Sequence, residues 1–154
     1  MARVGTRRTI GSGALSAAVV LLLTACLPFP PLGESSNGMK NSIDTTAVAE
    51  AVTATSDAIE TTIVETTIDG LTTALYVRPQ ISTESLTPAE LEGVLRVAYE
   101  LTRGEVATIQ VRTVDSADEP LDLSVAAGEL GIRHLTHINS VSYSTTNLET
   151  AFSE

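Results

Sequence analysis

The chain has 154 residues and a formal net charge of −10, from 9 basic and 19 acidic side chains. This excess of acid repels nucleic-acid backbones, so no nucleic-acid partner is expected. The chain contains one cysteine, Cys26, which excludes an intramolecular disulfide and leaves stability to a hydrophobic core.

A signal peptide is predicted for residues 1–25. Three arginines and no acid precede an apolar run over residues 14–23, and the small residues Thr24 and Ala25 come just before Cys26. A basic start, a short hydrophobic segment and a small-residue cleavage site are the three regions of a secretory leader. Its removal would leave 6 basic and 19 acidic side chains, a formal balance of −13.

The residues Leu23-Thr24-Ala25-Cys26 resemble the lipobox of bacterial lipoproteins, which consists of Leu, a small residue, Ala or Gly, and Cys. The resemblance implies that lipoprotein-processing enzymes attach a diacylglyceryl group to the Cys26 thiol and cleave the chain before it. It therefore implies a lipid anchor at the extracytoplasmic face of the cell membrane. Two acyl chains suffice for stable attachment, because each buried CH₂ contributes about 0.8 kcal/mol.

An uncleaved signal anchor is the alternative interpretation. Residues 10–29 are mostly apolar and barely long enough to span a bilayer. Gly11 and Gly13 dilute this segment and Pro28 begins a proline-rich end, which favours a removed signal. The pair Arg7-Arg8 leaves the export route open between the general secretory and twin-arginine pathways.

Residues 26–43 are predicted to comprise the lipidated cysteine and a disordered tether. Prolines, glycines and serines give this segment little apolar surface to bury. Its expected role is to space a folded domain from the membrane.

A single domain is predicted over residues 44–143, beginning with a helix and a β-hairpin. Asp44 can cap a helix whose apolar residues recur at spacings of three or four to about Asp57. Two β-rich runs, 61–68 and 71–78, flank Asp69-Gly70, which is typical of a type I′ hairpin turn. Pro79 is expected to end the second strand.

That turn would set the register of the hairpin and the faces of its strands. The expected pairs are Ile68 with Leu71, Thr66 with Thr73 and Val64 with Leu75, all on one buried face. The opposite, solvent-facing side would carry five residues: Glu65, Thr67, Thr72, Tyr76 and Arg78.

A second helix is predicted over residues 87–103. Thr87 is its expected N-cap, Pro88 its first residue and Glu90 the partner in a capping box. Its core-facing stripe would consist of Leu91, Val94, Leu95, Ala98 and Leu101, and Gly104 would end the helix.

The remaining elements have weaker signals. A strand is expected over about 106–114, then a polar turn over 115–120 and a short helix over 125–130, capped by Ser124 and closed by Gly131. An edge strand is expected within 135–143, and residues 144–154 are expected to form a frayed C-terminal tail. The fold class is therefore α+β, with a small antiparallel sheet (the hairpin plus one or two further strands) and two main helices packed on one face.

Chemical motifs are scarce. His134 and His137 form an H-x-x-H pair, but a strand would point them to opposite faces, and a zinc site needs more ligands than this pair supplies. The sequence contains no G-x-S-x-G elbow, no S-x-x-K and no P-loop. No catalytic, cofactor-binding or metal-binding residue is predicted.

The sequence therefore indicates a lipid-anchored, non-catalytic accessory protein that binds a protein or another component of the cell envelope. Tyr76 and Tyr99 are its expected surface anchors, since tyrosine is enriched at binding hot spots. One alternative is a carrier of a small hydrophobic ligand, with a cavity between helix 87–103 and the sheet. The other is a small hydrolase with His134 or His137 beside a serine and a carboxylate.

Overall fold

The computed structural model describes residues 43–153. The predicted signal peptide, the lipobox with Cys26 and nearly all of the tether lie outside the described residues. Over residues 43–153, no helix combines the length and the apolar composition that crossing a bilayer requires.

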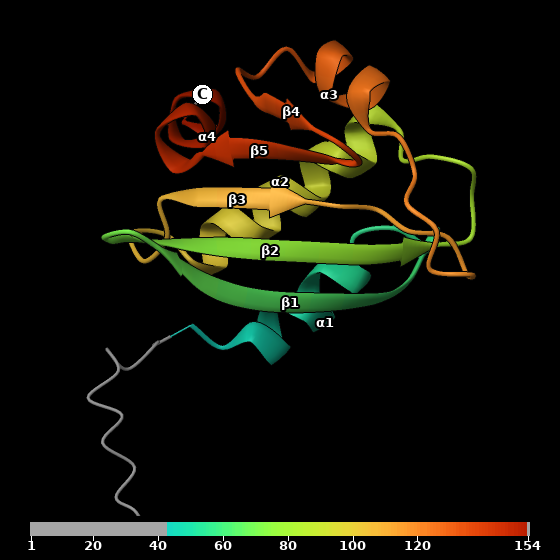
Figure 1. Cartoon of the computed structure of the whole chain (residues 1–154), viewed down its shortest axis with the longest axis horizontal. Coiled ribbons are helices and arrows are strands. Elements are labelled where there is room, and N and C mark those ends of the chain that lie inside the picture. Colours follow the sequence, from blue (N-terminus) through green and yellow to red (C-terminus); the bar gives the residue numbers. More distant parts are fainter. Residues whose placement is uncertain (1–42, 154) are drawn as a thin grey trace, which may run out of the picture. The chain divides into compact units, whose positions relative to one another are not determined.

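The described chain forms a five-stranded sheet and four helices (Figure 1). In chain order the elements are α1 (Thr45–Thr53), β1 (Ile59–Asp69), β2 (Thr72–Ile81), α2 (Pro88–Leu101), β3 (Thr108–Val111), α3 (Ser124–Leu130), β4 (Leu135–His137), β5 (Ser140–Ser144) and α4 (Thr145–Phe152). The strand order is β1-β2-β3-β5-β4, with β2 and β3 parallel and the other pairs antiparallel. The α+β class is confirmed, although the hairpin is joined by three further strands.

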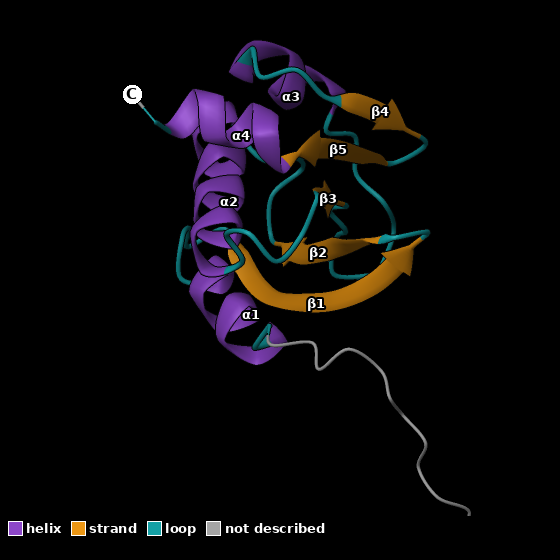
Figure 2. Ribbon diagram, turned by 90° about the vertical axis from the view of Figure 1, so that its left-hand side faces the viewer, coloured by secondary structure: helices purple, strands orange, loops and turns teal. Residues whose placement is uncertain are grey.

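The helices α1, α2 and α4 lie on one side of the sheet, as Figure 2 shows. Between the two layers is a core built from aliphatic side chains and two tyrosines, among them Val52, Leu75, Val77, Leu91, Val94, Leu95, Tyr99, Ile109, Val111, Tyr143 and Leu148. The face of the sheet that points toward the viewer in Figure 1 carries no helix of the described chain.

The ends of α2 follow the local sequence closely. The Thr87 hydroxyl accepts from the Glu90 backbone N–H, and the Glu90 carboxylate accepts from the Thr87 N–H, so the predicted capping box is confirmed. The predicted stripe is wrong at Leu101, which is half exposed. Tyr99 and Thr102 are buried instead, because the stripe continues around the helix from Ala98.

The hairpin register differs from the prediction by two residues. Asp69 pairs with Thr72 and Val64 with Val77, so the connection is Gly70-Leu71 and not Asp69-Gly70. Gly70 has φ +62° at the first central position, the pattern of a type II′ turn. A shift of two residues keeps every side chain on its side of the sheet. The predicted buried face is confirmed at Val64 and Leu75, but it is wrong at Ile68 and Leu71, which are exposed at the turn end of the hairpin.

Pro79 does not end β2, contrary to the sequence prediction. The Pro79 carbonyl accepts from the Val114 N–H, so the position of the missing Pro79 N–H is on the β3 side of the strand. There the regular ladder between β2 and β3 stops at Val77 and Val111, and pairing resumes only as an isolated bridge between Gln80 and Val114. The proline therefore interrupts one neighbour while β2 continues beside β1 to Ile81.

The two short helices each differ from the prediction at one end. The Asp44 cap of α1 is confirmed, since its carboxylate accepts from Thr46 N and Ala47 N, but α1 ends at Thr53. The Ser124 hydroxyl does not cap α3, because Ser124 is the first residue of that helix. Its backbone N–H and its hydroxyl both donate to the Asp122 carboxylate. Gly131, with φ +73°, closes α3 as predicted.

The C-terminal region is the largest correction. The single edge strand expected within residues 135–143 is a hairpin of β4 and β5 with Asn139 at φ +62° in its turn. The expected frayed tail is the helix α4, capped by the Ser144 hydroxyl and anchored by the fully buried Leu148. Several residues of α4 have low intrinsic helix propensity, and its packing against the rest of the domain compensates for this.

Candidate binding face of the sheet

The helix-free side of the sheet, called the open face below, is ordered in rows across the strands. The strand register aligns one row of five side chains: Glu65, Tyr76, Gln110, Ser142 and Leu135. A neighbouring row begins with Ile63 opposite Arg78. Alternation along each strand places these residues opposite the core-facing Leu75, Ile109 and Val141. The open face is thus a polar surface with isolated apolar groups.

A pocket of about 250 Å³ lies on the open face and is lined by Ile63, Glu65, Tyr76, Arg78 and Arg112. We call it the Tyr76 pocket. Tyr76 is 40% exposed and Ile63 is 45% exposed, so both offer apolar area to a ligand. The expectation that Tyr76 is a surface residue is confirmed.

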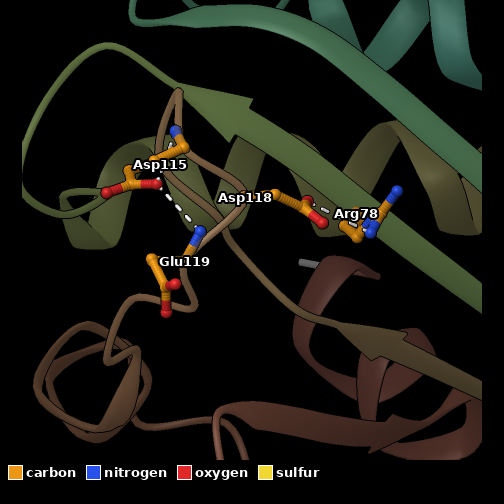
Figure 3. Close-up of polar contacts among 5 residues, drawn as sticks. Arg78, Asp115, Asp118 and Glu119 are labelled. Atoms are coloured by element: carbon orange, nitrogen blue, oxygen red, sulfur yellow. Dashed lines mark hydrogen bonds and ion pairs between the residues drawn. The ribbon is translucent and has the colours of Figure 1, made fainter.

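The turn after β3 contacts Arg78, one of the residues that line this pocket (Figure 3). Within the turn, the Asp115 carboxylate accepts from the backbone N–H groups of Ala117 and Glu119, at 2.8 and 2.9 Å. Asp118 adopts φ +64°, which is uncommon outside glycine but tolerated by aspartate. In this conformation its Oδ1 lies 3.2 Å from Arg78 Nη1 and so orients the guanidinium. The dashed line between the two side chains in Figure 3 marks this ion pair.

Arg112, just after β3, also lines the pocket. Its backbone N–H donates to the Val77 carbonyl at 3.0 Å, which continues the line of β3 along β2. Within residues 43–153 we find no hydrogen bond or ion pair for its guanidinium, and the side chain is exposed. Arg112 therefore has all five N–H donors available to a ligand.

The five arginines of residues 43–153 fall into two groups. On α2, Arg96 pairs with Glu92 at 2.7 Å and its guanidinium carbon lies 4.3 Å from the centre of the Phe152 ring. Arg103 lies over the Tyr99 ring at 5.1 Å. Arg78, Arg112 and Arg133 line pockets beside the open face, so most of the cationic charge of this acidic domain gathers there.

A second pocket, of about 240 Å³, lies where β3, β5 and the segment before β4 meet. It is lined by Thr108, Arg133, His134, Leu135, Ser142, Ser144 and Asn147, and we call it the His134 pocket. His134 Nδ1 lies 2.8 Å from the Ile132 carbonyl oxygen, and the His134 ring lies 5.5 Å from the Tyr143 ring. Asn147 Nδ2 donates to the Arg133 carbonyl at 2.9 Å.

The two histidines are placed differently. His134 precedes β4 and is partly buried, whereas His137 is exposed at the end of β4. A hydrolytic triad needs a carboxylate beside its histidine, and no Asp or Glu is among the residues that line the His134 pocket. In the described part of the chain, no group of three or more His, Cys, Asp or Glu residues is placed to hold a metal ion.

Tyr99 is not a surface anchor, contrary to the sequence prediction. It is buried beneath α4, with its ring centroid 6.0 Å from that of Phe152. The helix α4 that covers this side chain is formed by residues for which the sequence predicts a tail, so the burial of Tyr99 has no local signal.

The space between α2 and the sheet is filled. Leu91, Val94 and Leu95 of α2 have no exposed surface, and neither do Leu75 and Ile109 opposite them. Neither the Tyr76 pocket nor the His134 pocket is lined by any of these side chains. The cavity that a ligand carrier was expected to have at this place is therefore occupied by the core.

Comparison with known protein families, with characterised proteins and with solved structures finds no match to this chain.

Tyr76 and Arg78 are predicted correctly from the sequence to share the solvent-facing side of the hairpin. The contribution of Arg112 is not predicted, although the alternation of apolar and polar residues in its strand indicates the face on which it lies. No local pattern indicated that Asp118 would reach back to Arg78, because the contact spans forty positions of the chain.

Proposed function

We propose that this protein is an exported lipoprotein, anchored through Cys26, whose domain is a non-catalytic binding module. The observation that supports the binding role is the Tyr76 pocket. An exposed tyrosine and two arginines line it, on a sheet face that no described helix covers. Tyrosine and arginine are the residue types that most often dominate binding energy at protein interfaces.

The proposed anchor rests on the lipobox resemblance at Leu23-Thr24-Ala25-Cys26. It would hold the domain at the extracytoplasmic face of the membrane, after lipoprotein-processing enzymes have modified Cys26. The Cys26→Ala variant is expected to leave the membrane fraction while its domain keeps the unfolding midpoint of the wild type. Full retention of Cys26→Ala in the membrane would favour an uncleaved signal anchor.

The proposed binding face is tested by site-specific photo-crosslinking on intact cells. A photoreactive phenylalanine analogue is placed at Ile63, in the pocket, or at Leu101, on the far end of α2. These positions are matched, with 45% and 49% exposure. We expect one discrete adduct from position 63, lost on adding Tyr76→Ala, and none from position 101. Equal adducts from both positions, or none from position 63, would refute the binding face.

A further inference from the structure

We infer that the Tyr76 pocket recognises a single carboxylate on a peptide segment of a protein partner. This inference rests on the proposed function and adds the chemistry of the ligand. Arg112 is the group that carries it, because its guanidinium has no partner in the described chain while it lines a pocket large enough for one amino-acid side chain. Arginine binds carboxylates through paired N–H donors in a fixed planar geometry.

The neighbouring charges limit the ligand to one negative group. Arg78 already pairs with Asp118, which lies 3.2 Å away, so its positive charge is partly neutralised and it contributes mainly oriented N–H donors. Glu65, on β1, and Gln110, on β3, flank Tyr76 in one row across the strands. A second anionic group near β1 would face the Glu65 carboxylate, whereas a peptide N–H there would find an acceptor.

The charge of the whole chain separates a peptide from a polyanion. The predicted mature chain has a formal balance of −13. A polymer with many negative groups would be repelled over most of the surface and attracted only at this pocket. A peptide that offers one carboxylate beside an apolar group matches what is present: Arg112 for the carboxylate, and Tyr76 with Ile63 for the apolar group.

The test uses N-acetyl-L-phenylalanine as the probe, with its amide as the matched neutral compound. Binding is followed through the side-chain Nε–H signal of Arg112 in NMR spectra of the purified lipidated protein in detergent micelles. A probe of this size is expected to bind with a dissociation constant on the order of 1 mM. The amide should bind at least about tenfold more weakly, since it lacks the charge-assisted pair.

The arginine is tested with two variants. Arg112→Gln should abolish the preference for the acid over the amide. Arg133→Gln should preserve it, because Arg133 lines the His134 pocket and not the Tyr76 pocket. Arg112 and Arg133 are both exposed, so neither substitution should disturb the fold. Backbone amide spectra that match those of the wild type would confirm this.

Several outcomes would overturn the inference. Equal binding of acid and amide, a preference that survives Arg112→Gln, or a response only to a polyanion such as heparin would each do so. None of these results decides the proposed function, because the crosslink at Ile63 reports the binding face whatever the ligand. Loss of that crosslink would refute the face itself.

Discussion

Leu148 provides a direct test of whether the C-terminal helix is part of the fold. Its side chain is fully buried in the core, and α4 packs against both α2 and β5. The Leu148→Ala substitution removes three buried carbon atoms, which costs about 2.4 kcal/mol at ~0.8 kcal/mol for each. The cavity that remains adds to this loss, so unfolding free energy should fall by about 2.5–5 kcal/mol.

Leu135→Ala is the matched control, since it makes the same chemical change at a leucine that is 68% exposed on β4. It should change the unfolding free energy by less than about 0.5 kcal/mol. Urea denaturation of both variants, followed by circular dichroism, measures the difference. Thermal unfolding should show a fall in midpoint of about 10 °C or more for Leu148→Ala alone.

The opposing hypothesis is the frayed tail that the sequence favoured. If residues 144–154 had no stable place in the domain, the two substitutions would have the same small effect. Equal urea midpoints for Leu148→Ala and Leu135→Ala would therefore refute the packing of α4, and with it the burial of Tyr99 beneath Phe152.

Three further predictions follow from single polar groups. The Tyr143 hydroxyl is buried without a hydrogen-bond partner in the described chain, and burial raises its pKa to about 12. Tyr143→Phe should leave the unfolding free energy unchanged or raise it by up to about 1 kcal/mol. The wild type should lose stability as pH rises from 10 through about 12, and Tyr143→Phe should lose less over this range, as measured by urea denaturation. The Ser56 hydroxyl and then the Thr87 backbone N–H lower the pKa of Glu90, so its stabilising effect is complete above the unfolded value near 4.5 and is lost as pH falls through the lower folded value. Glu90→Gln should therefore destabilise the protein at pH 7, and this difference should shrink toward pH 3 in the same assay. At Asp118, Gly should be tolerated better than Ala by about 1 kcal/mol, because φ is +64° and the exposed pair with Arg78 contributes little; equal stabilities of the two variants would contradict this.

Local signals explain which parts of the fold the sequence predicts correctly. The start of α2 is determined within four residues by the Thr87 cap, Pro88 and Glu90, so no distant contact is needed to place it. The hairpin is intermediate, since both Asp69-Gly70 and Gly70-Leu71 are acceptable turns. Choosing between them depends on cross-strand pairs such as Val64 with Val77, which lie outside the turn.

The errors are at places where long-range packing decides. Residues 145–147 are Thr, Thr and Asn, which favour helix weakly, so α4 depends on the packing of Leu148 and Phe152 against the core. The continuation of β2 through Pro79 likewise depends on what lies beside it. The proline is tolerated because its missing donor falls where the β3 ladder has already stopped.

The Tyr76 pocket was accessible to sequence reasoning only in part. Tyr76 and Arg78 share a face by simple alternation, and that prediction is confirmed. Arg112 joins them because β3 lies beside β2 in parallel, a pairing created by the crossover through α2. A sheet that was entirely antiparallel, as predicted, gave no reason to place residue 112 next to residue 78.

The proposed lipid anchor would compensate for the weak affinity of the proposed pocket. A single carboxylate held by Arg112 and an apolar contact on Tyr76 would give an affinity only on the order of 1 mM. Free in solution, such a site would be mostly empty. Confinement of the anchored protein and a membrane-attached partner to one surface would raise their effective concentration to about the same millimolar range, so a weak site would be substantially occupied without any further contact. On this argument Cys26→Ala should weaken the crosslink at Ile63 on cells while leaving the binding of N-acetyl-L-phenylalanine unchanged, and a loss of probe binding in that variant would contradict the division of roles.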